Sequence, residues 1–511
     1  MLLLSALLTL AAAPQADTAA RELPTEDPPI ERLHPMLAPT IRQGPFDARW
    51  ASLIDHPLPT WFQDSKVGLS AHWGPYCVPG WTPRKDTPYG VAYAEWYWQW
   101  MQSNQAVKDH HRTVWADVPY DAFIDGTKNL ETGEIVGFRA EDFDADAWME
   151  LFERAGVRYF FITAKHHDGF CTFDSDFTER DAVDMGPRRD LFGELVTAAR
   201  KRGIRVGLYY SFYEWFNPAY TGNPAHAEYA GFTPLADRDL DGEDGEYVDD
   251  FMVPQIKELI DRYHPDMLCF DGEWEHGYPH WRARQILAYY YNQAAERGQE
   301  VVANDRYGQK KEGASDTRGV YGDFYHVEYH ADIDRTKPWS MWRGFGNSYG
   351  YNRNEHPSNV LTIPQTIQML VDVVSDNGNI EFNLGPKADG SLAAFEVERL
   401  EAIGAWLDVN GEAIYGTRKS PFGAQSFGRT TYDAAAKRLY LHVDQWPEGG
   451  ALELTGGAVK AARAWPLARP GEALRTKPLP GGGLIISLPA APLDPAVTVI
   501  AVEYEGEIEA R

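Results

Sequence analysis

Short runs of apolar residues alternate with amphipathic segments between residue 66 and about residue 418. The runs are rich in β-branched and aromatic residues, as buried strands are, and cover residues 66–73, 157–164, 204–211, 266–271, 299–304 and 378–385. In the segment 145–155, Trp148, Leu151 and Phe152 have helical spacing and Gly156 ends the pattern. The same spacing predicts further helices at 190–203, 254–263 and 362–375.

This alternation predicts an α/β fold in which a parallel sheet closes as a (β/α)8 TIM-like barrel. An open doubly wound sheet is the alternative, but no GxGxxG motif follows any of the predicted strands. The helix signals are uneven, so we expect an irregular barrel in which some helices are missing or replaced.

The pattern changes beyond residue 420. Short alternating runs, separated by Gly and Pro turns, occur at 437–445, 451–455, 460–465, 483–488 and 497–504. This spacing predicts a C-terminal antiparallel β-sandwich. We therefore expect a lead-in at 20–60, a catalytic barrel at 61–420 and the sandwich at 421–511.

The first 19 residues are predicted to hold a signal peptide and the start of the lead-in. An apolar run at 2–13 ends in small residues and is too short to span a bilayer, and cleavage is expected near Ala13 or Ala19. No later run reaches the length of a membrane span. A secreted or periplasmic protein is the expectation.

Charge and cysteine content argue against several classes of function. The formal net charge is -27, which makes nucleic-acid binding improbable and disfavours a heavily sulfated polymer as the main substrate. The three cysteines, Cys77, Cys171 and Cys269, fit neither a disulfide scaffold nor a CxxC metal pattern. We expect all three to be buried and reduced.

Polar residues directly follow five of the predicted strands, where barrel enzymes gather their chemistry. These residues are His72-Trp73, His166-His167-Asp168-Gly169, Tyr209-Tyr210-Ser211, Asp271-Gly272-Glu273-Trp274 and Asn304-Asp305-Arg306. A lone strand-end Asp is usually a helix cap, but five such strand ends predict a functional cleft.

Hydrolysis of a glycosidic bond by a retaining enzyme needs a carboxylate nucleophile and a carboxylic acid that protonates the leaving oxygen. The nucleophile must be rigid and ionised, which suits the strand-end Asp271. The acid benefits from a raised pKa and some mobility, and a Glu in a loop can have both properties. His and Arg side chains can bind sugar hydroxyls, and a Trp face can stack on the sugar.

Metal-dependent hydrolysis is the competing enzyme class, because His72, His166, His167 and Asp271 could be ligands. However, adjacent histidines on a strand should point to opposite faces, and there is no HExxH motif. The acidic segment 237–246 matches the first half of an EF-hand loop but has Val248 in place of the bidentate Glu. We expect a solvated loop there, with no metal and no cofactor in the protein.

Taken together, these motifs resemble glycoside hydrolase family 29, the α-L-fucosidases, from about Val67 to Arg418. The segments KVGLSAHWGPYCVPGW, AEWYWQWM, GVRYFFITAKHHDGFCTFDS, GLYYS and CFDGEW carry the resemblance. It implies that Asp271 is the nucleophile. It also implies that fucose is bound by His72, Glu95, Trp96, His166, His167 and Tyr210, with Tyr209 as the alternative tyrosine.

The acid/base varies among subgroups of that family. NDRYG followed by GDFYHVEYH resembles the subgroup in which Arg306 contacts the sugar and Glu328 is the acid/base. Tyr349 stands where the family places an aromatic ring against fucose. Asp323, Glu273 and Glu312 are the lesser candidates for the acid. Retention requires Asp271 and Glu328 to face each other across about 5–5.5 Å.

Two segments depart from the family pattern. Cys269 stands where the family often has a pocket Trp, and KPWSMW at 337–342 lacks the Lys-Trp-Glu of many members. The prediction is a retaining exo-α-L-fucosidase acting on fucosylated oligosaccharides or glycoconjugates. A related α-L-glycosidase, such as an α-L-galactosidase, and a silent carbohydrate-binding protein are the alternatives. The oligomeric state is left open.

Overall fold

The computed structural model describes residues 32–87, 90–220, 246–308, 322–329, 333, 335, 337–480 and 482–510. The predicted signal peptide and nearly all of the acidic segment 237–246 lie outside these residues. Within the described part of the chain, no helix is long and apolar enough to cross a membrane.

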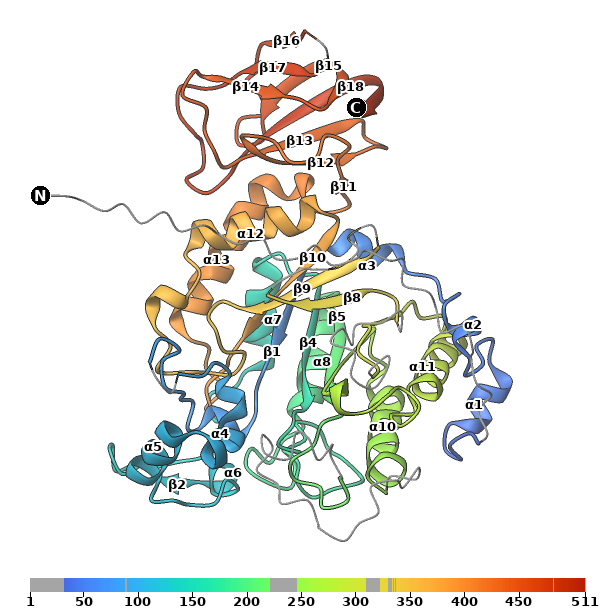
Figure 1. Cartoon of the computed structure of the whole chain (residues 1–511), viewed down its shortest axis with the longest axis vertical. Coiled ribbons are helices and arrows are strands. Elements are labelled where there is room, and N and C mark those ends of the chain that lie inside the picture. Colours follow the sequence, from blue (N-terminus) through green and yellow to red (C-terminus); the bar gives the residue numbers. More distant parts are fainter. Residues whose placement is uncertain are drawn as a thin grey trace, which may run out of the picture.

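Eight parallel strands form the sheet at the centre of the molecule (Figure 1). They are β1 (Val67–Ala71), β4 (Tyr159–Lys165), β5 (Arg205–Ser211), β6 (Met267–Asp271), β7 (Val302–Ala303), β8 (Tyr325–Glu328), β9 (Trp339–Gly344) and β10 (Gly378–Leu384). Neighbours follow chain order, and β10 returns to pair with β1. The backbone N–H of Asp323 donates to the carbonyl of Ala303 at 2.9 Å, which links the two remaining edges. The predicted TIM-like barrel is confirmed.

Six of the eight strands overlap with predicted apolar runs, whereas β8 and β9 were not predicted. These two strands place polar side chains inside the barrel, so they do not have the hydropathy of a buried strand. His326 of β8 lies 2.8 Å from Glu381 of β10, and both side chains are fully buried. Ser340 of β9 donates to the same carboxylate at 3.0 Å. Because these polar groups contact one another inside the barrel, polar strands can occupy the core.

The four predicted helices are present as α7 (Ala145–Arg154), α8 (Leu191–Lys201), α10 (Val253–Tyr263) and α12 (Ile363–Ser375). Their starts are capped as the sequence suggests: Asp144 accepts from the N–H of Ala147, and Thr362 forms a capping box with Gln365. Two further barrel helices, α11 (Ala283–Arg297) and α13 (Ala394–Asn410), were not predicted. Most positions of α11 are buried, so its sequence lacks the polar face by which an amphipathic helix is recognised.

Shorter elements surround the barrel. The helices α1 (Ala38–Gln43), α2 (Trp50–Leu53) and α3 (Thr60–Ser65) precede it. Between β1 and α7 the chain forms α4 (Tyr97–Ser103), α5 (Gln105–Trp115), α6 (Ala122–Asp125) and the hairpin β2 (Thr127–Lys128) with β3 (Ile135–Val136). Figure 1 shows this insertion at the end of the barrel away from the C-terminal sheets.

The C-terminal region consists of two antiparallel sheets, as predicted (Figure 1). The larger contains β11 (Arg418–Lys419), β12 (Gly428–Asp433), β13 (Arg438–Val443), β18 (Thr498–Ala510) and β15 (Gly457–Pro466). The smaller contains β14 (Ala451–Leu454), β17 (Leu484–Ser487) and β16 (Thr476–Pro478). Alternate residues such as Leu439, Leu441, Leu452 and Ile486 point between the sheets and form a separate apolar core.

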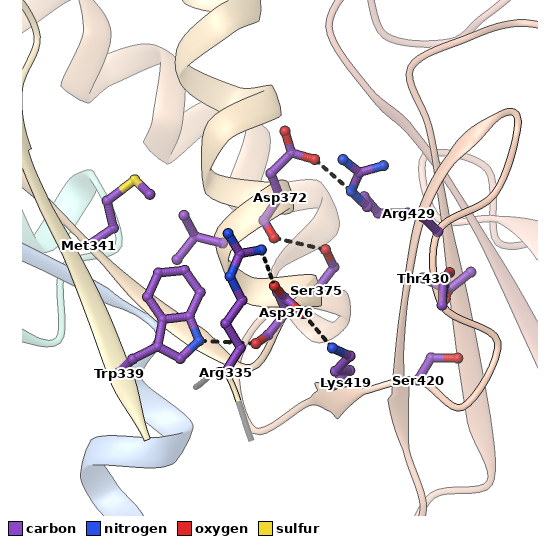
Figure 2. A pocket seen from close by; sticks show the side chains of 13 residues that line it. Arg335, Trp339, Met341, Asp372, Ser375, Asp376, Lys419, Ser420, Arg429 and Thr430 are labelled. Atoms are coloured by element: carbon purple, nitrogen blue, oxygen red, sulfur yellow. Dashed lines mark hydrogen bonds and ion pairs between the residues drawn. The ribbon is translucent and has the colours of Figure 1, made fainter. Parts of the chain in front are cut away.

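A cavity of about 460 Å³ lies between the barrel and these sheets (Figure 2). Asp376, which follows α12, pairs with Lys419 of β11 and with Arg335, each at 2.5 Å. Asp372 of α12 pairs with Arg429 of β12 at 2.8 Å. The cavity wall is therefore held together by ion pairs that connect the two regions of the chain.

We expect Asp376→Asn to destabilise the protein by about 1 kcal/mol near neutral pH. Burial alone would raise the pKa of Asp376, but hydrogen bonds from Lys419 and Arg335 outweigh it and lower the pKa. A carboxyl group whose pKa is lower in the folded than in the unfolded protein stabilises the fold when the pH is above its unfolded-state pKa. This contribution is lost as the pH falls through its folded-state pKa. Denaturant unfolding of both proteins should therefore show a difference that shrinks in acid and in high salt.

Asp372→Asn is the matched control, because it removes an ion pair from the same cavity. Burial raises the pKa of Asp372 despite the charge of Arg429, so ionisation of this residue does not favour the fold at neutral pH. We expect a smaller loss of stability, or none. Equal losses for the two variants at every pH would contradict the assigned role of Asp376.

Candidate active site

The barrel brings two of the predicted carboxylates to one guanidinium group. Asp271 is the last residue of β6 and Glu328 is the last residue of β8, while Arg306 follows β7, which lies between them in the chain. Nη1 of Arg306 donates to Oδ1 of Asp271 at 2.5 Å, and Nη2 donates to Oε1 of Glu328. The two carboxyl groups, 57 positions apart in the sequence, thus contact the same side chain.

Asp271 is held as an anion. Tyr209 donates its hydroxyl hydrogen to Oδ2 of Asp271 at 2.7 Å, and Nε2 of His167 lies 4.0 Å from the same oxygen. Burial would raise the pKa of Asp271, but the Arg306 charge and the Tyr209 hydrogen bond contribute to a net lowering of the pKa. Burial lowers the pKa of His167 to about 3, so Arg306 is the permanent positive charge beside Asp271.

Three histidines lie beside this group of residues, all of them buried. The rings of His166 and His167 lie 4.1 Å apart, and His72 lies 5.3 Å from His166. Burial lowers the pKa of His72 to about 4 and that of His166 well below its ordinary value, which leaves neutral rings. Nδ1 of His166 has no hydrogen-bond partner among the described residues.

The expectation that adjacent His166 and His167 point to opposite faces is wrong. Strand β4 ends at Lys165, so both residues lie in the following loop, where two-residue alternation no longer applies. Even so, no group of three or more His, Cys, Asp and Glu side chains in the described part of the chain is arranged to hold a metal ion.

The choice between the two adjacent tyrosines is corrected by the structure. Tyr209 reaches Asp271, whereas Tyr210, the predicted site residue, donates to Oε1 of Gln255 at 2.8 Å outside the barrel. Successive side chains of a strand point to opposite faces, so only one of the pair can face the barrel interior. Because both tyrosines are almost fully buried, hydropathy could not distinguish them.

Glu95, Trp96 and Tyr349 come from elements far from Asp271 in the sequence and lie beside the same group of residues. Oε2 of Glu95 accepts from the N–H of Gly350 at 2.8 Å, and burial raises the pKa of Glu95 to about 8, which keeps it protonated at neutral pH. The ring of Trp96 lies 5.2 Å from that of His167. Tyr349 donates to Oε2 of Glu328 at 3.2 Å.

The lesser acid candidates fall in three different places. Glu273 is buried near Asp271 and Arg306, its pKa is raised by burial to about 7, and its Oε2 has no hydrogen-bond partner among the described residues. Asp323 is occupied by His56, at 2.8 Å, and by the N–H of Ala303. Glu312 lies outside the described residues.

Two polar residues that position the histidines were missed as site residues. Nδ1 of His72 lies 2.8 Å from Oδ1 of Asn383, and Nδ1 of His167 lies 2.6 Å from Oγ of Ser211. Asn383 lies on β10 and Ser211 ends β5. Ser211 belongs to one of the five polar strand ends, whereas Asn383 lies inside the predicted apolar run 378–385 and was not singled out.

All three cysteines are buried and free, as predicted. Sγ of Cys269 lies 3.3 Å from Nδ1 of His326 and accepts from the side-chain amide of Asn304 at 3.7 Å. The residue is thus part of the polar network inside the barrel, directly below Asp271 on β6.

Comparison with known proteins decides the family. A sequence model described as "Alpha-L-fucosidase" matches residues 36–412. The chain belongs to the α-L-fucosidase family. A tissue α-L-fucosidase of Rattus norvegicus is 34% identical over 454 residues, covering 87% of this chain and 88% of the relative. The human tissue α-L-fucosidase is 33% identical over 455 residues, covering 87% of this chain and 88% of the relative.

Solved structures of other fucosidases share the fold. The α-fucosidase of Thermotoga maritima in complex with a mechanism-based inhibitor superimposes with a TM-score of 0.73 at 31% identity, covering 90% of this chain and 100% of that one. The same enzyme in complex with fucose gives a TM-score of 0.72, also at 31% identity, covering 89% of this chain and 100% of that one. The irregular barrel with C-terminal sheets is therefore a fucosidase architecture.

We expect Tyr209→Phe to lower kcat/KM of this fucosidase on an aryl α-L-fucoside by roughly ten- to a hundredfold. This is the worth of a hydrogen bond to a charged group, about 1.5–3 kcal/mol. In wild type the hydrogen bond from Tyr209 lowers the pKa of Asp271. Its loss should raise that pKa and move the acid limb of the pH profile to higher pH. Steady-state kinetics across the acidic range measures both effects.

Tyr210→Phe is the control for this prediction. The substitution removes the same hydroxyl from the neighbouring residue but breaks only the bond to Gln255. We expect the acid limb to stay in place. A shift caused by Tyr210→Phe and not by Tyr209→Phe would reverse the assignment of the two residues.

Proposed function

We propose that this fucosidase removes terminal α-L-fucose from fucosylated oligosaccharides or glycoconjugates with retention of configuration. In the first step a carboxylate oxygen of Asp271 attacks the anomeric carbon, and the glycosidic C–O bond breaks. The proton of Glu328 passes to the departing oxygen. In the second step water attacks the fucosyl ester, Glu328 takes the proton of the water, and Asp271 leaves as a carboxylate.

The observation that carries the proposal is the bridge formed by Arg306. One guanidinium contacts both carboxyl groups, so both lie within hydrogen-bonding reach of the same side chain, which supports a joint action on one glycosidic bond. Their surroundings differ as the two roles require. The side chain of Asp271 is 11% exposed and accepts from Tyr209 and Arg306. That of Glu328 accepts from Arg306 and Tyr349 and is 31% exposed, which suits the group that must meet the leaving oxygen and water.

Burial of the cleft supports exo action. His72, His166 and Asp271 expose 3%, 2% and 8% of their surfaces, which suits a pocket that encloses one terminal sugar and not a groove along a polymer. Neutral histidines and Trp96 would bind the hydroxyl groups and one face of that sugar. The apolar run at residues 2–13 supports a secreted or periplasmic location.

The test is to trap the intermediate. Incubation with a 2-deoxy-2-fluoro-fucosyl donor, followed by peptide mapping, should locate one fluorofucosyl group on Asp271. During turnover of an aryl α-L-fucoside, NMR should record α-L-fucose as the first product, before mutarotation. A first product of β configuration, or a label on another residue, would overturn the proposal.

A further inference from the structure

A fully buried ion pair links the residue that precedes His166 to the loop that follows β5. Nζ of Lys165 donates to Oε2 of Glu214 at 2.6 Å, and neither side chain is exposed. The same ammonium group donates to the hydroxyl of Tyr247 at 3.3 Å. Removing two charges from water offsets much of their attraction, whereas separating them inside the protein is strongly unfavourable. The pair therefore adds little net stability but holds two segments of the chain together.

A β-bulge turns Lys165 away from the barrel interior. Phe161 of β4 belongs to the same buried cluster as Tyr209, which faces the interior, and two-residue alternation would direct Lys165 to that side as well. However, Thr163 lies opposite Tyr209, and Lys165, two residues further on, lies opposite Tyr210, the next residue of β5. Such an irregularity re-aims a side chain. Nζ of Lys165 accordingly lies 4.7 Å from the centre of the Tyr210 ring, outside the barrel.

The carboxylate of Glu214 joins the loops that follow β4 and β5. Its Oε1 accepts from the N–H groups of Phe216 at 2.8 Å and Asn217 at 3.1 Å, which fixes the turn after β5. The same oxygen lies so close to Gly169, in the loop after β4, that an added Cβ would be 2.4 Å from it. Its Oε2 accepts from Lys165 at the end of β4. One side chain thus contacts both loops.

His167 lies where these two loops meet. The N–H of Trp215, the residue after Glu214, donates to the carbonyl of His167 at 2.7 Å, and the two rings lie 5.3 Å apart. Nε2 of His167 is 4.0 Å from Oδ2 of Asp271. A displacement of this loop by about 1 Å would move the imidazole relative to Asp271, and misplacements of that size can lower a rate on the order of a hundredfold.

We propose that Glu214 is a positioning residue of the active site, which acts through His167. Its carboxylate, paired with Lys165, ties the two loops together and fixes the imidazole beside Asp271 before the sugar binds. Binding then costs less ordering of the pocket. The side chain of Glu214 is fully buried and does not contact the substrate. This inference rests on the proposed fucosidase mechanism and adds a residue to it.

The experiment removes both charges at once, in an uncharged-pair variant that combines Lys165→Met with Glu214→Gln. An amide at position 214 can still accept from the N–H groups of Phe216 and Asn217, so we expect a melting temperature similar to that of wild type. The link between the loops is lost, and kcat/KM for an aryl α-L-fucoside should fall about ten- to a hundredfold. An unchanged kcat/KM would overturn the inference.

A double-mutant cycle with His167→Ala distinguishes positioning from a general loosening of the protein. A residue that acts through the imidazole has nothing to position once that ring is removed. The uncharged-pair substitutions should therefore lower kcat/KM of His167→Ala by about twofold or less, measured with a dinitrophenyl fucoside. Losses that multiply in full would show that the pair acts independently of His167, and the inference would fail.

Asp266→Asn is the matched control. Asp266 pairs with Arg205 at 3.2 Å and accepts from the N–H of Val206 at 3.0 Å, so it also ties two neighbouring strands together, but at the opposite end of β5 and β6. Its kcat/KM should equal that of wild type. A tenfold loss here would show that any broken ion pair of the barrel lowers activity, and the special role of Glu214 would be refuted.

Should the uncharged-pair variant fail to fold, Glu214→Asp decides, because it keeps the charge and shortens the reach of the carboxylate. Its kcat/KM should fall by a smaller factor, again with little effect in the His167→Ala background, and a wild-type value would count against positioning. A wild type that hydrolyses no aryl α-L-fucoside would instead refute the proposed function and this inference with it.

Discussion

Replacing Asp271 with glycine abolishes hydrolysis of an aryl α-L-fucoside, with an expected loss on the order of 10⁴-fold or more. Arg306 and Tyr209 both donate to this carboxylate, and its removal takes the proposed nucleophile from that position. Added azide should restore part of the activity, because this small anion fits the space left by the side chain. The product should be the β-L-fucosyl azide, formed by a single displacement of the aryloxide.

The configuration of that azide makes the test specific. In a variant that lacks the acid/base, azide would attack the fucosyl ester and yield the α-L-fucosyl azide. Asp271→Gly and Glu328→Ala should therefore give opposite anomers, which NMR distinguishes. Wild-type turnover by Asp271→Gly without azide would refute the assignment of the nucleophile.

For Glu328→Ala we expect a loss that depends on the leaving group. With an alkyl or poorly activated aryl fucoside, the departing oxygen needs a proton, and kcat/KM should fall by about 10²–10⁴-fold. With a dinitrophenyl fucoside the departing oxygen needs no proton, so the first step should be nearly unaffected. A plot of log kcat/KM against the pKa of the leaving phenol should become steeper than in wild type.

Glu273→Gln is the control for this series. Glu273 is the other buried glutamate near Asp271, and its pKa is raised by burial to about 7. If it only shapes the pocket, its substitution should lower the activity by a similar factor for every leaving group. A leaving-group dependence in Glu273→Gln and none in Glu328→Ala would transfer the acid/base role to Glu273.

Local sequence patterns predicted those parts of the fold that depend on one segment at a time. Strands β1, β4, β5, β6 and β10 are continuous buried runs, and they fall within one or two residues of the expected positions. Strands β8 and β9 could not be recognised in this way. Their polar residues, such as His326 and Ser340, are stabilised by Glu381 from a third strand, a partner that no local window includes.

In the candidate site, too, the sequence predicted some features, whereas others depended on tertiary contacts. Strand-end position and the family resemblance together pointed to Asp271, Glu328, Arg306 and the histidines, because a parallel barrel directs every strand end to one face. The order of residues in the chain predicted that these groups meet. It did not predict that one guanidinium would contact both carboxyl groups, since that contact depends on the side chains around Arg306.

By itself, the sequence determined the strand–helix alternation, the change to antiparallel sheets and the identity of the strand-end groups, because these follow from hydropathy and chain order. Only the tertiary structure decided that Tyr209 and not Tyr210 faces Asp271, and that the ring of Trp342 packs against that of Tyr349. Both outcomes depend on which face of a strand points inward. In a barrel buried on both faces, the burial of each residue is the same either way, so only the packed neighbours settle the choice.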